Sequence, residues 1–255
     1  AAKSMAEKSQ QQRDISLSVL TDSVWDENKV LELWQYYDDD YFLRHSVDEI
    51  IRQTEQRLEQ PNVSTLIKTR CYDDDGTIEI FVLTKDKRGI FSAIAVALDH
   101  LQLNILDAKI NTASNGELLN TFIVNGPERD TNEIVNEIYN GLDNLNKIDV
   151  STVYTPRIMT LFRTAPVINY QNSVQDKYTI LELYTNDRPG LISTVAQVFI
   201  DCKIHLLNAK LVTLGDQVED VFFITTIDHK ALSSRHKLQI KEALVGAFTE
   251  IDLLQ

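Results

Sequence analysis

The sequence predicts an α+β protein built from two copies of a small β-α-β-β-α-β unit with antiparallel sheets, behind a short helical segment. The first observation is a repeated turn: "KDKRGIFSAIAVAL" at 85–98 is followed 101 residues later by "NDRPGLISTVAQVF" at 186–199. The second is that alternating strands and apolar helical stripes surround each copy in the same order. A chain that repeats an unusual turn together with its surroundings is expected to contain one module twice.

The N-terminal part divides into a polar segment and a helical segment. The polar segment is placed at 1–23, and residues 1–14 show no early apolar period, so we interpret it as an artificial chain end or the tail of a preceding domain. Residues 24–60 are expected to be helical, with Ser46 and Glu49 spaced as a capping box. Their apolar residues form two helical faces, Val30, Leu33 and Trp34 on one and Ile50, Ile51 and Leu58 on the other. Neither face is wide enough for a free-standing core.

The two modules are expected at 76–154 and 178–255, joined by a linker at 155–177 with room for extra strands. The inward strand positions are expected to be Ile78, Ile80, Val82, Leu106, Ala108 and Ile110, and then Thr179, Leu181, Leu183, Leu207, Ala209 and Leu211. The helical stripes are Ile90, Ile94, Ala97 and Leu101 with Ile134, Ile138 and Leu142, and Leu191, Val195, Val198 and Cys202 with Ile240, Leu244 and Phe248. Hairpin turns are expected at 114–117 and 214–217. Each module should end on a short strand, at 147–150 and 250–254, which completes a ferredoxin-like plan.

Composition and charge exclude several classes of function. The net charge of −13 argues against a nucleic-acid partner, because neutralising phosphates requires clustered Lys and Arg. Charged residues interrupt the apolar stretches before they reach the ~18 residues of a membrane span, and no signal peptide is recognisable, so we expect a cytoplasmic protein with no membrane partner. Cys71 and Cys202 give no disulfide framework, and the five histidines are scattered, so no metal site is expected.

The repeated turn itself predicts a site for a small zwitterion. Its glycine permits a positive φ or a close backbone approach, and a helix begins immediately after it. The first N–H groups of that helix have no partner within it and carry the positive end of its dipole, so they can bind a carboxylate. Asp187 has two interpretations: it caps the helix or completes a tight turn, or it faces the ammonium group of the same ligand. A free amino acid is the smallest ligand that would use both charges.

Three segments taken in order resemble a known family. They are "LELWQYYDDDYFLRHS" at 31–46, "LDAKINT" with "LNTFIV" at 106–112 and 119–124, and "GDQVEDVFFI" at 215–224. They are similar to the C-terminal part of the bifunctional uridylyltransferase/uridylyl-removing enzymes that modify PII nitrogen-signalling proteins, where two ACT domains follow an HD-type domain. The resemblance implies that 24–60 ends an HD-type domain, that the two modules are ACT domains, and that the chain senses L-glutamine.

The resemblance also implies where the chemistry of such an enzyme would lie. This chain lacks a Gly-Ser with an Asp-x-Asp pair and lacks a helical HD motif, so no catalytic residue and no cofactor are expected in it. The transferase and hydrolase activities, with Mg²⁺, would belong to a longer parent enzyme. The PII protein would be a partner through that full-length enzyme.

In the same family, the loop of one ACT module faces the start of the second strand of the other. By position, the ligand-binding residues would be Asp86, Arg88, Gly89 and Ile90 in the first module, Asp187, Pro189, Gly190 and Leu191 in the second, and Asn104 and His205 at the strand starts. Arg88 stands where the second loop has Pro189, and His205 where the first module has Asn104. The outward residues Asp107, Lys109, Asn208 and Lys210 could contact a ligand or form a solvated strand edge, and we favour the solvated edge.

Two other classes of function remain open at the level of sequence. The chain could be an ACT regulatory module of another metabolic enzyme or of a (p)ppGpp synthetase. It could instead be a ligand-free dimerisation module, because ferredoxin-like sheets can pair edge to edge, and a homo-oligomer through these edges is open in either case. A thermal-shift screen against the amino acids separates a sensor from a dimerisation module.

Overall fold

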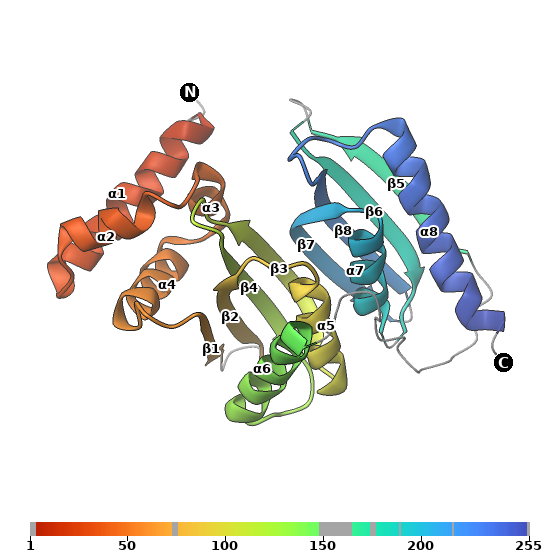
Figure 1. Cartoon of the computed structure of the whole chain (residues 1–255), viewed down its shortest axis with the longest axis horizontal. Coiled ribbons are helices and arrows are strands. Elements are labelled where there is room, and N and C mark those ends of the chain that lie inside the picture. Colours follow the sequence, from red (N-terminus) through yellow and green to blue (C-terminus); the bar gives the residue numbers. More distant parts are fainter. Residues whose placement is uncertain are drawn as a thin grey trace. The chain divides into compact units, whose positions relative to one another are not determined.

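A computed structural model gives the fold of the chain (Figure 1). The structure describes residues 4–72, 76–147, 165–173, 177–188, 190–215 and 217–253. The helices in this part of the chain are α1 Met5–Ser23, α2 Glu27–Trp34, α3 Asp39–Arg44, α4 Val47–Glu59, α5 Ile90–His100, α6 Thr131–Lys147, α7 Leu191–Asp201 and α8 Ser234–Leu253. The strands are β1 Thr65–Cys71, β2 Ile78–Lys85, β3 Asn104–Thr112, β4 Glu117–Asn125, β5 Val167–Asn172, β6 Thr179–Asn186, β7 Ile204–Leu214 and β8 Gln217–Thr226.

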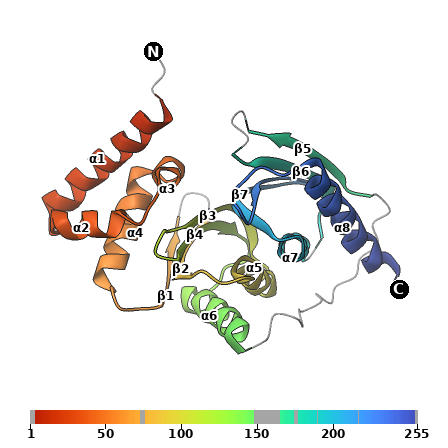
Figure 2. The same ribbon diagram turned by 45° about the horizontal axis from the view of Figure 1, so that its top comes forward.

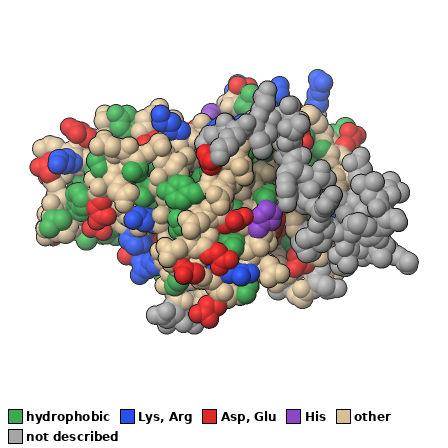
Figure 3. Space-filling model, turned by 60° about the horizontal axis from the view of Figure 1, so that its bottom comes forward, with side chains coloured by type: hydrophobic (Ala, Val, Ile, Leu, Met, Phe, Trp, Pro, Cys, Tyr) green, Lys and Arg blue, Asp and Glu red, His purple; other side chains and the backbone are tan. Residues whose placement is uncertain are grey.

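The chain divides into two compact units. The first unit comprises residues 1–68, 81–86 and 109–121, and the second comprises 69–80, 87–108 and 122–255. Strands β1, β2, β3 and β4 therefore each contribute residues to both units. No helix in the described ranges is long and apolar enough to cross a membrane. Carboxylate side chains gather beside a histidine on the face drawn in Figure 3, in keeping with the net charge of −13.

The four N-terminal helices begin at polar caps. The predicted capping box at α4 is confirmed, since Ser46 accepts from the N–H of Glu49 and the Glu49 carboxylate accepts from the N–H of Ser46. Most of the polar segment 1–23 is the helix α1, which packs on α3 and α4. Its buried positions include Ser9 and Ser16 beside Leu20, so small polar residues occupy the contact face and no apolar period shows in the sequence.

The N-terminal helices complete their core on strands of the first module. Leu20, Val30, Trp34 and Ile50 form one buried cluster with the strand and hairpin residues Leu66, Phe81, Leu83, Ala113 and Leu119. Ile80 and Val82 point to the opposite face of β2 by the two-residue period of a strand, and both are fully buried. Both faces of β2 are therefore covered, which explains its almost unbroken apolar sequence "IEIFVLT".

The second module is an antiparallel sheet with two helices on one face (Figure 2). β8 pairs with β6 on one side and β7 on the other, and β5 adds to the far edge of β6. The predicted stripes of α7 and α8 are buried at Leu191, Val195, Val198, Ile240, Leu244 and Phe248. A bulge between Leu206 and Asn208 shifts the register of β7, so Leu206 is buried and the predicted inward Leu207 is only half-buried.

The strand order is β1-β2-β4-β3-β7-β8-β6-β5. The α+β class with two ferredoxin-like modules behind helices is confirmed, but each edge strand precedes its module: β1 comes before β2, and β5, inside 155–177, comes before β6. The final strand predicted at 250–254 is wrong, because α8 continues to Leu253. Its sequence keeps the helical spacing, with Ile251 three residues after Phe248. The final strand predicted at 147–150 lies almost entirely outside the described residues.

Candidate functional site

A cavity of about 570 Å³ lies within the second unit. One wall is the end of α5 and the start of β3, including Asp99, His100 and Asn104. The opposite wall is the β6–α7 loop and the first turn of α7, including Asp187, Gly190, Leu191 and Ser193, and the floor includes Leu211, Val218 and Asp220. The repeated turn of the second module and the strand start of the first module therefore line the same cavity.

The start of α7 presents to this cavity backbone donors that have no partner among the described residues. Gly190 is the N-cap with φ of 74°, a left-handed conformation that favours glycine, and no side chain caps the turn. Leu191 N–H donates to Arg188 O over 3.2 Å, and Thr194 N–H makes the first helical bond to Gly190 O over 2.9 Å. The N–H groups of Ile192 and Ser193 lie between these two bonds, where a helix start can bind an anion.

The proposal that Asp187 caps the helix is wrong, because the N-cap is Gly190 and no side-chain oxygen accepts from the first turn. Asp187 is exposed and lines the cavity. Its other interpretations, as a residue that completes a tight turn or as the partner of a ligand ammonium group, stay predictions.

A hydrogen bond joins the two walls of the cavity. The Ser193 hydroxyl lies 2.9 Å from Asp99 Oδ2 and 3.0 Å from Gly190 O. Burial raises the pKa of the Asp99 carboxyl, while the bond from Ser193 acts in the opposite direction. The end of α5 is thereby fixed to the start of α7 by a side chain of each helix.

Asp220 is a cavity residue that the sequence analysis missed. It lies on β8 opposite Leu183 and Leu211, it is 2% exposed, and its Oδ2 has no hydrogen-bond partner among the described residues. Burial raises the pKa of its carboxyl to about 7, against a hydrogen bond from the Val212 N–H, and the charge of Asp187 raises the pKa further. The signal was available: in "VEDVFFI" the buried positions alternate, and Asp220 stands between buried Val218 and Phe222.

The corresponding loop of the first module is built differently. Gly89 is again a left-handed N-cap, with φ of 92°, and a Cβ on it would lie 3.3 Å from Leu145 Cδ2. Arg88 Nη2 donates to Ile200 O at the end of α7 over 2.8 Å. This loop therefore presents a guanidinium group to the carboxyl end of α7, where the helix dipole favours a positive charge.

The structure thus brings together four of the residues predicted for the site: Asn104, Asp187, Gly190 and Leu191. Asp86, Arg88, Gly89 and Ile90 do not line this cavity. His205 does not line it either, and its ring lies 5.2 Å from that of His229. Pro189 lies outside the described residues. Across the described part of the chain, no group of three or more His, Cys, Asp or Glu could hold a metal ion.

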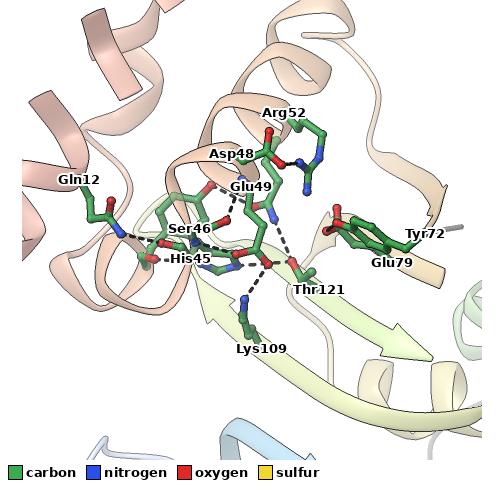
Figure 4. Close-up of polar contacts among 12 residues, drawn as sticks. Gln12, His45, Ser46, Asp48, Glu49, Arg52, Tyr72, Glu79, Lys109 and Thr121 are labelled. Atoms are coloured by element: carbon green, nitrogen blue, oxygen red, sulfur yellow. Dashed lines mark hydrogen bonds and ion pairs between the residues drawn. The ribbon is translucent and has the colours of Figure 1, made fainter. Parts of the chain in front are cut away.

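A second group of polar residues is buried inside the first unit (Figure 4). Lys109 Nζ donates to Glu49 Oε1 over 2.6 Å, so the expectation of a solvated edge is wrong for Lys109, whereas Lys210 is exposed as expected. Thr121 lies 3.4 Å from His45 Nε2 and accepts from Gln53 over 2.9 Å. Burial lowers the pKa of His45 to about 4, so it is neutral at pH 7. These contacts tie α4 to β3 and β4.

The fold and the cavity define the class: an α+β protein of two ferredoxin-like modules in tandem behind a helical domain, with a small-molecule-sized cavity in its second unit. Comparison with known proteins identifies the family. Residues 4–56 match the family model described as the fifth domain of the uridylyltransferase GlnD. The N-terminal residues are therefore part of a family domain, and the assignment of 24–60 to the end of an HD-type domain stays a prediction.

Relatives match almost the whole chain. The bifunctional uridylyltransferase/uridylyl-removing enzyme of Pseudomonas savastanoi pv. phaseolicola is 36% identical over 244 residues, covering 90% of this chain and 27% of that protein. The enzyme of the same name from Azotobacter vinelandii is 34% identical over 261 residues, covering 93% of this chain and 28% of that protein. The chain belongs to this family and corresponds to a region of it, spanning about a quarter of the length of these relatives.

One solved structure, of an unknown protein from Galdieria sulphuraria, aligns over 69% of this chain and 91% of its own length with a TM-score of 0.25 and 12% identity. The fold of the chain is defined by its own strand order.

Proposed function

We propose that this chain is the glutamine-sensing regulatory region of a bifunctional uridylyltransferase/uridylyl-removing enzyme that controls the PII protein in nitrogen assimilation. Its two modules act as ACT domains, and L-glutamine binds in the cavity between the α7 start and the β3 start. The observation that carries the proposal is that the N–H groups of a helix start and three acidic side chains, of which Asp220 is buried, line the same cavity.

The cavity suits an α-amino acid in both charge and size. The ligand carboxylate would accept from the N–H groups of Ile192 and Ser193, at the positive end of the α7 dipole. The ligand ammonium group would lie toward Asp187 and the side-chain carbonyl of Asn104, on opposite walls. A volume of about 570 Å³ is within the ~300–1,000 Å³ usual for small-ligand sites.

In this proposal, catalysis and the interaction with PII belong to the parent enzyme. The chain itself carries no catalytic residue and no cofactor, and Mg²⁺ serves the catalytic part of the parent enzyme. The partner is PII, through the full-length enzyme in the cytoplasm, with no nucleic acid and no membrane involved. Self-association would use the sheet edges that β1 and β5 leave open.

The test is calorimetric titration of the folded chain with L-glutamine. Two matched variants locate the site, because Asn104 and His205 are equivalent by the repeat and only Asn104 lines the cavity. Asn104→Ala should weaken binding roughly tenfold, the loss of about one hydrogen bond, and His205→Ala should leave it unchanged. Absence of heat and of a thermal shift at millimolar glutamine, with the fold verified by circular dichroism, would overturn the proposal and favour the ligand-free dimerisation module.

A further inference from the structure

Asp220 is the most unusual side chain of the cavity. It occupies an inward position on the central strand of its module, between the apolar partners Leu183 and Leu211, and only 2% of it is exposed. One carboxyl oxygen has no hydrogen-bond partner among the residues that the structure describes. A buried oxygen without a partner destabilises the fold, so its place on a cavity floor indicates that a ligand satisfies it.

The two acidic residues of the second module lie at different depths. Asp187 is in the exposed loop beside the start of α7, where the α-carboxylate and α-ammonium groups of an amino acid would bind. Asp220 is buried beside Leu211 and Val218, away from solvent. A ligand held by its α-groups at the loop would therefore direct the end of its side chain to Asp220.

The charged groups around the cavity disfavour a second carboxylate at that depth. Asp99, Asp187 and Asp220 all line the cavity. Of the basic residues that line it, Arg188 lies over the Phe248 ring at 3.8 Å, and His100 lies 3.0 Å from Glu137. The three acidic groups outnumber these two basic groups, so a ligand carboxylate at the depth of Asp220 would meet more negative than positive charge.

We propose that Asp220 is the specificity-determining residue of the cavity, accepting an uncharged side-chain amide and excluding a side-chain carboxylate. An amide can complete the bonding of the Asp220 carboxyl by donating to it through its NH₂ group, or by accepting from it through its oxygen when the carboxyl is protonated. Glutamate, which differs from glutamine only in this group, is rejected because two carboxyl groups would share one buried position. This inference rests on the proposed function.

The test compares the affinities for L-glutamine and L-glutamate, by calorimetry, in the wild-type chain, in Asp220→Asn and in Glu219→Gln. Glu219 is the exposed neighbour on the same strand, so its variant makes the same change of charge outside the cavity. Asp220→Asn is expected to fold, because it removes an acid from an apolar position and keeps the shape. Urea unfolding of each variant verifies this.

We expect the wild-type chain and Glu219→Gln to prefer glutamine over glutamate by at least a hundredfold. Asp220→Asn should reduce that preference at least tenfold, mainly through tighter glutamate binding, with glutamine affinity changed by less than fivefold. An unchanged ratio in Asp220→Asn would overturn the inference and leave the glutamine site intact. Loss of glutamine binding without gain of glutamate would also overturn it, and would assign Asp220 to the ligand ammonium group. If the wild-type chain binds neither ligand, the proposed function itself fails.

Discussion

Replacing Lys109 with methionine should destabilise the first unit by about 3 kcal/mol at pH 7. Lys109 Nζ donates to Glu49 Oε1 over 2.6 Å, and the two side chains are 17% and 10% exposed. Methionine keeps most of the apolar stem and removes only the charge. Glu49 would then be a buried carboxylate that still accepts from the N–H of Ser46. Breaking such a pair costs roughly 3–5 kcal/mol, with partial exposure favouring the low end.

Urea unfolding followed by tryptophan fluorescence measures this change directly. The chain has two tryptophans, Trp25 and Trp34, and both belong to the first unit. Lys210→Met is the matched control, because Lys210 is equivalent to Lys109 by the repeat and is exposed, so it should change stability by less than ~0.5 kcal/mol. The double variant with Glu49→Gln should lose ~2 kcal/mol less than the sum of the single variants.

The cost of Lys109→Met should depend on pH in a defined direction. Burial acts to raise the pKa of Glu49, but the bond and charge of Lys109 outweigh it, and the folded pKa is lowered. The stability that this provides is present above the unfolded pKa of 4.5 and is lost as the pH falls through the folded value. The difference between the wild-type and variant chains should therefore shrink below pH 4.5. A cost under ~1 kcal/mol at pH 7, or strict additivity of the double variant, would refute the buried pair.

Three further predictions concern the second unit. Asp187→Asn should lower glutamine affinity roughly ten- to a hundredfold in calorimetry without changing stability, and Asp86→Asn should have a smaller effect; wild-type affinity in the first variant would contradict a ligand role. Gly126→Ala should lower thermal stability by about 2 kcal/mol, because its φ is 153° and a Cβ would lie 2.7 Å from a backbone oxygen, whereas Gly246→Ala has open space and should be neutral or stabilising. The raised pKa of Asp220, about 7 against 3.8, means that the folded state holds its proton longer, so stability falls as the pH rises from 4 to 7. This fall in stability, which is at most ~4 kcal/mol, should be absent in Asp220→Asn. If urea unfolding from pH 5 to 8 gives the variant the same dependence of stability on pH as the wild-type chain, the carboxyl is not desolvated.

Local patterns in the sequence were enough to predict the repeat and its elements. These patterns were the helical stripes of α5 and α7, the hairpin turns and the capping box at Ser46. Each depends on residues that lie within about one or two helical turns of one another in the sequence. The facing of Asn104 and Asp187 came from the family resemblance, because the two residues lie 83 positions apart in sequence and no local pattern joins them.

What the sequence did not predict depends on tertiary packing. Lys109 and Lys210 occupy equivalent positions of the repeat, yet only Lys109 meets a carboxylate from α4. The sequences of β2, "IEIFVLT", and β6, "TILELYT", carry a signal of this difference in packing. The unbroken apolar run of β2 indicates a strand covered on both faces, and the alternation of β6, whose positions are buried and half-buried in turn, indicates one covered face.

The covering of β2 and β4 by the N-terminal helices decides where this chain can be divided. A fragment that begins at β1 would expose Phe81, Leu83 and Leu119 to water, and a contiguous apolar patch of that kind promotes aggregation. Expression of the first module without its helices is therefore expected to fail for reasons unrelated to ligand binding. Chimaeras between relatives should exchange residues 5–147 as one piece, although a boundary near residue 60 looks natural in the sequence.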